Sequence, residues 1–214
     1  INEQFERSLE FWSELSVRGK MPVPSAFINP CPHMILVLGE PDAVFLRERH
    51  RLLSAHHFFK PMVMTEEKSQ IAEWAPLLME DRDMKQPMAV TRAQRGTDVD
   101  FGALTRYLFD ALRRSENCTI SLATEVRDLT RYAGNGWMLS LQNRKTGEKE
   151  ECRARFVFIG AGGGSLPLLL KSGIPEGRGY GGFPVSGQFL MCTNDAIIQK
   201  HSSKVYGKAS IGAP

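Results

Sequence analysis

The chain has 214 residues, of which 42% are hydrophobic and 24% are charged, a composition typical of an ordinary soluble globular protein. Its 27 basic and 24 acidic side chains nearly balance, and no long run of lysine or arginine occurs, which argues against nucleic acid as a partner. The longest apolar stretches, such as 34–38 and 166–170, are far shorter than the roughly 20 residues of a membrane-spanning helix, so any membrane contact is expected to be peripheral.

The cysteines are widely spaced, with no C-x-x-C pair and no Cys/His cluster at zinc-ligand spacing. They are Cys31, Cys118, Cys152 and Cys192. We therefore expect reduced cysteines in a cytosolic compartment and no metal site. The chain begins at Ile1 rather than at a methionine and leads directly into a helix-like pattern, which processing and a cloned fragment would both explain.

The first half of the chain predicts helices that alternate with strands. Residues 2–18 carry an apolar side chain at every third or fourth position, which is the stripe of an amphipathic helix. Thr65 and Asp100 are each expected to be the N-cap of the helix that follows. The expected elements are a helix over 2–18, a strand over 34–38, a helix over 41–56, a short helix over 66–74, a strand over 87–95, a turn over 96–100 and a helix from Phe101 onward.

From Cys118 onward the pattern changes to short strands. They are expected over 118–122, 125–129, 137–141 and 154–159. The second and third are separated by the turn-forming residues Ala133 to Gly136, which predicts a hairpin. The last ends in an uninterrupted apolar run, which is typical of a strand covered on both faces.

A glycine-rich turn, Ile159 to Ser165, follows this last expected strand and precedes an apolar, helix-like run. Glycines allow a ligand to approach the backbone closely, and a helix N-terminus offers free N–H groups to a pyrophosphate. The turn departs from the dinucleotide fingerprint G-x-G-x-x-G, because Ser165 stands at the position of the third glycine. A tight turn between a strand and a helix, without any ligand, is the alternative interpretation.

The order of these elements is more specific than any one of them, and it resembles the flavoproteins of the D-amino-acid oxidase and glycine oxidase type. The resemblance implies that the backbone of Val126 holds the adenine of FAD. It implies that the turn formed by Gly160, Ala161, Gly162 and Gly163 lies against the ribose and pyrophosphate. The segment 183–188 would then return the chain to the substrate domain.

Six blocks of sequence, in order along the whole chain, are similar to one family in that group, the malate:quinone oxidoreductases. They read INEQFERSLEFW, FINPCPHM, EWAPLLME, TRAQRGTDVDFGALTR, FVFIGAGGGSLPLL and GIPEGRGYGGFPVSGQ. Family members are longer and open with a Rossmann G-x-G-x-x-G. The resemblance therefore implies that this chain is an internal fragment, inactive by itself and without FAD when it is isolated.

The fold class that we expect is mixed α/β. A partial FAD-binding domain with a three-stranded meander, over residues 96–182, would be interleaved with a substrate domain. The substrate domain would be built on a mixed or antiparallel sheet with helices, and its portions would be residues 1–95 and 183–214.

The activity that the resemblance implies is the oxidation of malate to oxaloacetate, a step of the tricarboxylic acid cycle, by hydride transfer to FAD. A membrane quinone would then accept the electrons. The protein would be cytoplasmic and peripheral to the inner (plasma) membrane. Two alternatives remain open, namely an FAD-dependent enzyme for another 2-hydroxy acid and a non-enzymatic binding module.

Two residues are candidates for contact with malate, whose oxidation requires a base near the C2 hydroxyl and cations near the carboxylates. His33, at the start of a buried-looking strand, is the best histidine for the base, and a structural histidine that caps a loop is its alternative. Arg92 is the first choice for a carboxylate clamp because its guanidinium forms a planar bidentate fork. A solvated arginine on a strand face is the alternative.

Overall fold

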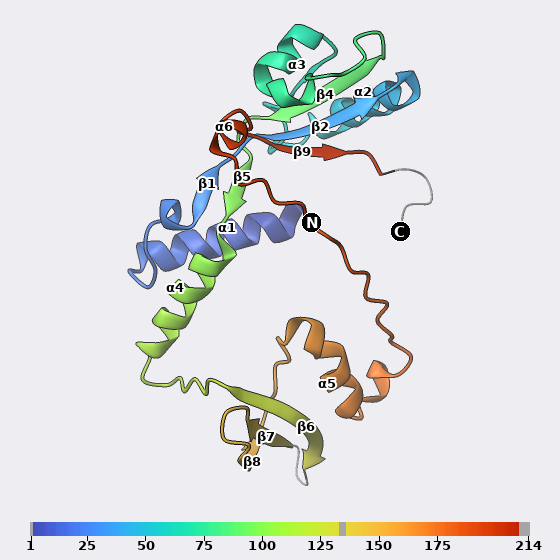
Figure 1. The fold of residues 1–214 in the computed structure, drawn as a ribbon. Coiled ribbons are helices and arrows are strands. Elements are labelled where there is room, and N and C mark those ends of the chain that lie inside the picture. The colour runs from blue at the N-terminus through green and yellow to red at the C-terminus, as the bar shows by residue number, and fades with distance from the viewer. Residues whose placement is uncertain (1, 133–135, 210–214) are drawn as a thin grey trace. The chain divides into compact units, whose positions relative to one another are not determined.

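The structure is a computed structural model that describes residues 2–132 and 136–209. The chain forms two compact units. Unit 1 contains Ile1–Glu116 and Leu190–Pro214, and unit 2 contains Asn117–Phe189 (Figure 1). The boundaries between these units lie at 116/117 and 189/190. The predicted domain boundaries, at 95/96 and 182/183, both lie earlier in the chain. Residues 96–116 belong to unit 1 because strand β5 (Thr97–Val99) pairs with β1 (Ile28–Pro30).

Unit 1 is built on a four-stranded mixed sheet. Its strands are β2 (His33–Leu38), β3 (Val63–Thr65), β4 (Met88–Ala93) and β9 (Lys204–Gly207), in the order β3-β4-β2-β9. The pairs β2–β4 and β3–β4 are antiparallel, and β2–β9 is parallel. Although β9 comes from the end of the chain, it lies beside a strand from its beginning (Figure 1).

Each face of this sheet is covered by one helix. Helix α3 (Lys68–Trp74) covers the face that carries Met34 and Val90, and we call it the α3 face. Helix α2 (Glu40–Leu53) covers the opposite face, the α2 face, which carries Val37 and Ala89. The alternation of buried side chains along β2 and β4 therefore assigns every residue of these strands to one of two cores.

The remainder of unit 1 packs α1 (Asn2–Val17) and α4 (Phe101–Arg113) against the β1–β5 ribbon. Phe27 is 1% exposed at the centre of this cluster. The side chain of Asp100 accepts a hydrogen bond from the backbone N–H of Ala103 at 2.8 Å, so the predicted N-cap of α4 is confirmed. The turn expected over 96–100 is wrong in part, because Thr97–Val99 is strand β5 and bonds to β1.

Unit 2 contains an antiparallel meander, whose first two strands were predicted and whose third strand lies earlier in the chain than the expected 154–159. Strands β6 (Thr124–Tyr132), β7 (Gly136–Asn143) and β8 (Lys149–Ala154) pair in the order β6-β7-β8. Helix α5 (Ser165–Lys171) packs against β6. Leu129 and Trp137 supply the buried side chains of this meander. Residues 133–135 of the predicted hairpin turn lie outside the described residues.

Three predicted local features are wrong. Residues 118–122 form no strand, since no neighbouring strand completes their backbone hydrogen bonds. The strand expected over 154–159 does not form, because the third strand of the meander is Lys149–Ala154, and Phe156 and Phe158 beyond it are 78% and 84% exposed. A strand that is apolar on both faces needs neighbours on its edges and layers on its faces, and the described part of the chain provides neither.

The third error concerns Thr65, which ends β3 instead of capping α3. Its hydroxyl accepts a hydrogen bond from the backbone N–H of Glu67 at 3.1 Å, and Glu67 occupies the N-cap position. The ladder with β4 holds Thr65 in extended conformation, two residues before the cap.

Short helical turns complete the fold. They are η1 (Pro24–Ala26), η2 (Pro76–Leu78), η3 (Gly162–Gly164), η4 (Pro175–Gly177) and α6 (Asp195–Ile198). No helix among the described residues is both long enough and apolar enough to cross a membrane.

Candidate functional site

The residues predicted to act in binding or catalysis are divided between the two units. His33 and Arg92 belong to the sheet of unit 1, and Val126 and the glycine turn 160–163 belong to unit 2.

Arg92 lies on β4, with its side chain on the α3 face. Its register partner is Met34, which belongs to the core cluster on that face. The Cζ atom of Arg92 lies 5.2 Å from the centre of the Trp74 ring, within the range of a cation–π interaction. Its Nε atom is buried and has no hydrogen-bond partner among the described residues. This is not the environment of a solvated arginine on a strand face.

His33 lies on the α2 face, where protein groups surround its ring. Nε2 is 3.0 Å from the carbonyl oxygen of Thr97, and the ring meets Tyr206 edge-on at 6.1 Å between centroids. Gly96 lies so close that an added Cβ would be 2.7 Å from Cδ2 of His33 and 2.4 Å from the carbonyl oxygen of Cys31. These contacts support the structural alternative for this histidine.

The sheet does not bring the predicted base and the predicted carboxylate clamp together. His33 is paired with Ala93, and Arg92 is paired with Met34, so their side chains point to opposite faces. A small ligand on one face of the sheet cannot contact both side chains.

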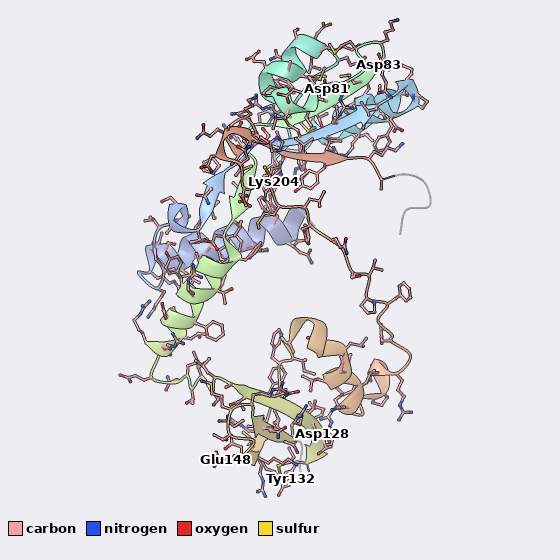
Figure 2. The ribbon with its side chains drawn as sticks, viewed as in Figure 1. Asp81, Asp83, Asp128, Tyr132, Glu148 and Lys204 are labelled. Atoms are coloured by element: carbon pink, nitrogen blue, oxygen red, sulfur yellow. The ribbon has the colours of Figure 1, made fainter. Side chains whose placement is uncertain are left out.

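An ion pair beside His33 was not predicted from the sequence. Lys204, at the start of β9, is labelled in Figure 2. It forms a hydrogen-bonded salt bridge with Asp98 of β5. The hydrogen bond from Lys204 lowers the pKa of the Asp98 carboxyl, and the same bond raises the pKa of the lysine. The two residues are 106 positions apart in the sequence, and no local pattern signals such a contact.

Val126 is half-buried on β6, where the ladder with β7 is irregular. Val126 pairs with Leu141, and the register then shifts before Asp128, so Arg127 forms a bulge. The carbonyl oxygen of Arg127 accepts a hydrogen bond at 2.6 Å from Lys171 at the end of α5. Bulges of this kind interrupt strand pairing and often lie next to functional sites.

The glycine turn is an exposed connection that leads into α5. The backbone N–H of Ala161 donates to the hydroxyl of Ser165 at 3.0 Å, which closes the turn. Gly162 has φ +55°, in the left-handed region that favours glycine. The expectation that a strand delivers this turn directly is wrong, because β8 ends at Ala154.

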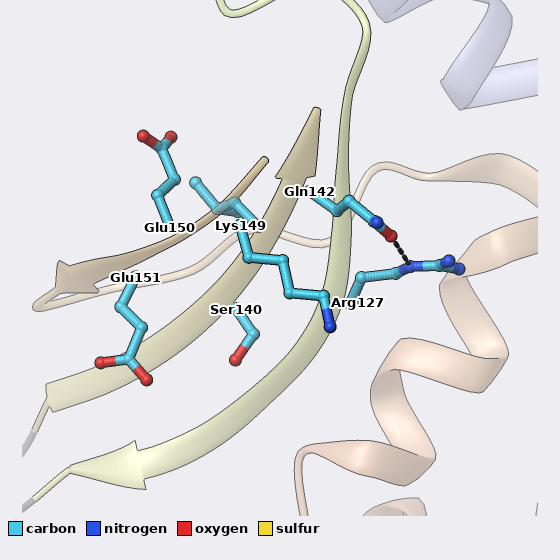
Figure 3. Close-up of a pocket in the computed structure, with 7 residues that line it drawn as sticks. Arg127, Ser140, Gln142, Lys149, Glu150 and Glu151 are labelled. Carbon is cyan, nitrogen blue, oxygen red and sulfur yellow. Dashed lines mark hydrogen bonds between the residues drawn. The ribbon is translucent and has the colours of Figure 1, made fainter. Parts of the chain in front are cut away.

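A hollow of about 660 Å³ lies on the polar face of the meander (Figure 3). Its lining consists of Arg127, Ser140, Leu141, Gln142, Lys149, Glu150 and Glu151. Arg127 donates from Nε to the Gln142 side chain at 2.8 Å and from Nη1 to Glu125 at 2.9 Å. The glycine turn does not line this hollow. Within residues 2–132 and 136–209, no group of three or more His, Cys, Asp or Glu side chains could hold a metal ion.

Comparisons with known proteins extend over the whole chain. The sequence model of the malate:quinone oxidoreductase family, Mqo, matches residues 1–214. A probable malate:quinone oxidoreductase from Hahella chejuensis is 51% identical over 214 residues, which are all of this chain and 43% of that protein. Probable malate:quinone oxidoreductases from Paenarthrobacter aurescens and Geobacillus kaustophilus are 52% and 50% identical, again over all of this chain and 42% of each protein.

One solved structure is similar at the level of fold. It is an L-proline dehydrogenase from P. horikoshii, with a TM-score of 0.55 and 14% identity, over 79% of this chain and 40% of that chain. This chain spans less than half the length of the curated relatives that it matches. Since the family model and these relatives match it from residue 1 to residue 214, the chain belongs to the malate:quinone oxidoreductase family.

Proposed function

We propose that the protein containing this chain oxidises malate to oxaloacetate, with FAD as the hydride acceptor and a membrane quinone as the final electron acceptor. The observation that carries the proposal is the match to the malate:quinone oxidoreductase family over all 214 residues. Because the chain spans 43% of a relative's length, this activity belongs to the whole protein.

The glycine turn fits a role beside the cofactor. An added Cβ at Gly163 would meet no atom within 4 Å, and the backbone of Gly163 is outside the left-handed region. Neither packing nor backbone conformation in the described chain therefore requires glycine at this position. A group that approaches the backbone from outside, such as the ribose or pyrophosphate of FAD, would explain the lack of a side chain.

The distance between the two proposed cofactor contacts is also suitable. Helix α5 begins just after the glycine turn, and its last residue, Lys171, contacts the bulge beside Val126. Seven helical residues rise about 10 Å, which is comparable to the separation of adenine and pyrophosphate in an extended nucleotide. When bound, FAD would accept the hydride from C2 of malate, while the chain's own residues hold and orient the two ligands.

Arg92 is the residue of unit 1 that we assign to a malate carboxylate. Its guanidinium lies over the Trp74 ring, and its buried Nε–H has no acceptor within the described part of the chain, so an anionic oxygen would complete its hydrogen bonding. His33 serves the fold in this proposal, since Thr97 and Tyr206 engage its ring on the opposite face. The proton of the malate hydroxyl would then pass to a base outside this sheet.

The proposal includes a cytoplasmic protein that binds peripherally to the inner membrane, where it would meet its quinone. The absence of a long apolar helix among residues 2–132 and 136–209 is compatible with this location.

The test is to purify the full-length protein and record its flavin absorbance and its turnover of malate with a soluble quinone. We expect a flavin spectrum and a higher kcat/KM for malate than for lactate or 2-hydroxyglutarate. A preference for another 2-hydroxy acid would establish the first alternative. A protein that purifies without flavin and has no turnover would contradict the proposal and support a binding module.

A further inference from the structure

Helix α2 is apolar on two opposite sides. Its inner side carries the buried residues Ala43 and Leu46, which pack on the α2 face of the sheet. Because an α-helix has about 3.6 residues per turn, five other positions of α2 line up on the side that points away from the sheet. They are Pro41, Val44, Phe45, Glu48 and Leu52, which we call the outer ridge. A helix with one buried side normally presents polar residues to solvent, so the outer ridge requires an explanation.

The apolar residues of the outer ridge are exposed. Val44, Phe45 and Leu52 are 53%, 45% and 57% exposed, and Pro41 is exposed as well. Single exposed apolar residues are ordinary, but these residues are aligned along about 16 Å of one helix. A continuous apolar strip on a surface is typical of a site that binds a protein or a membrane.

The carboxylates of α2 are all engaged in ion pairs. The pairs are Glu40 with Arg47, Asp42 with Lys208 and Glu48 with Arg51. The Nζ atom of Lys208 also lies 4.8 Å from the centre of the Phe45 ring, so a cation borders the outer ridge. Negative charge beside the outer ridge is therefore neutralised by neighbouring cations.

Positive charge continues past the end of α2. No acidic residue occurs between positions 49 and 65, a stretch that contains Arg49, Arg51, Lys60 and three histidines. Neither Arg49 nor Lys60 forms an ion pair with any described residue. The ring of His50 lies 3.1 Å from the carbonyl oxygen of Met62, which keeps the loop after α2 beside the last turns of the helix.

We propose that the outer ridge docks α2 on the surface of an anionic membrane. Val44, Phe45 and Leu52 enter the interface between headgroups and acyl chains, and Arg49 and Lys60 contact lipid phosphates. A bilayer with anionic lipids fits such a surface, because it offers apolar chains beneath a layer of negative charge. A symmetric contact with a second copy would instead bring the same cations together. The inference rests on the proposed function, in which the whole protein reaches a membrane quinone.

The experiment measures co-sedimentation of the full-length protein, with its cofactor, with lipid vesicles. The vesicles contain equal parts of phosphatidylglycerol and phosphatidylcholine. The double variant Phe45→Gln, Leu52→Gln should lower the partition coefficient about tenfold or more, because each inserted apolar side chain contributes to binding. The matched control is Phe11→Gln, Val17→Gln, which removes two apolar residues of α1 that are 51% and 89% exposed and should bind like the wild type.

A second pair of variants tests the charges. Arg49→Gln, Lys60→Gln should lower binding to the anionic vesicles about tenfold or more and leave binding to vesicles of phosphatidylcholine alone unchanged. The control, Lys85→Gln, Lys145→Gln, removes the same charge from two exposed turns. Equal effects of the two double variants would overturn the inference, because binding would then depend on net charge and not on this surface.

Phe45→Trp keeps an aromatic ring and provides the measurement if the glutamine variants do not fold. Its added fluorescence should be quenched by vesicles with brominated acyl chains. Absence of quenching would overturn the inference and assign the outer ridge to a contact with the remainder of the protein. Wild-type vesicle binding by Phe45→Gln, Leu52→Gln would overturn it as well, and a changed oligomeric state of this variant would then identify a second copy as the partner.

The proposed function is judged separately, by turnover of malate with a soluble quinone, which all these variants should retain. Vesicle binding through the outer ridge without oxidation of malate refutes only the proposed function. Oxidation of malate with a soluble quinone by a protein that does not bind the anionic vesicles refutes only the inference.

Discussion

The guanidinium of Arg92 lies over the ring of Trp74, 5.2 Å from its centre, on the α3 face of the sheet of unit 1. The two residues are adjacent only because α3 packs on the face of the sheet to which Arg92 belongs. A charged group in this position is expected to serve a ligand, since the buried Nε–H has no acceptor among the described residues.

The first prediction concerns the bidentate geometry of Arg92. In the full-length protein, Arg92→Lys keeps the charge but loses the planar fork, so the KM of malate should rise by about tenfold or more. Steady-state kinetics measure the effect, and Arg51→Gln is the control, because Arg51 is exposed and forms an ion pair with Glu48. A wild-type KM in Arg92→Lys would show that Arg92 does not bind the substrate.

The second prediction concerns Gly163. Gly163→Ala meets no atom within 4 Å, so the melting temperature should stay the same or increase slightly, while the FAD affinity of the full-length protein should fall. Thermal unfolding and flavin fluorescence measure the two effects. Gly207→Ala, in equally open space on β9, is the control and should keep normal FAD affinity. Equal affinities in both variants would remove the glycine turn from the cofactor site.

The third prediction separates the two interpretations of His33. If its role is structural, His33→Gln should lower the melting temperature by a few degrees, as the loss of about 1 kcal/mol does in a domain of this size. The pH profile of kcat/KM should keep its shape. A catalytic base would behave differently, because its loss reduces the rate by a factor of about 10² to 10⁴.

The fourth prediction concerns the pH dependence of the Asp98–Lys204 pair. The hydrogen bond from Lys204 lowers the pKa of Asp98. The ionised carboxylate therefore stabilises the folded chain at pH values above the ordinary aspartate pKa, and this stabilisation is lost as the pH falls below that pKa. The pKa of Lys204 is raised, so its contribution is lost only in strong alkali. Asp98→Asn should therefore lower the melting temperature slightly at neutral pH, because the pair is exposed, and should match the wild type in strong acid. If the melting temperatures of Asp98→Asn and the wild type differ by the same amount at neutral pH and in strong acid, the ion pair is not the source of the difference.

The fifth prediction concerns the 214-residue chain alone. The two proposed contacts, at Val126 and at the glycine turn, would have to offset the entropy of ordering a long cofactor, so FAD should bind more weakly than micromolar. A fluorescence titration measures the affinity. A Kd of 1 μM or below, about 8 kcal/mol of binding free energy, would show that the chain contains a complete cofactor site.

Local sequence chemistry determined several elements of this fold. Asp100 caps α4 as its side chain and position predict, and the two alternating segments 125–129 and 137–141 form the expected hairpin strands β6 and β7 of the meander. The six sequence blocks were sufficient to indicate the family that the later comparisons established. These features depend on residues near one another in the chain, so a linear pattern can reveal them.

Only the tertiary structure decided which chemical groups share a surface. His33 and Arg92 both looked suitable for malate, but the register of β2 with β4 places them on opposite faces. Lys204 had no distinguishing pattern in the sequence, and the parallel pairing of β9 with β2 brings it beside His33, where it forms an ion pair with Asp98. The apolar run at Phe158 looked like a buried strand, yet burial requires neighbouring strands that the described chain does not supply. Strand register and burial depend on partners far away in the sequence, and no local pattern specifies them.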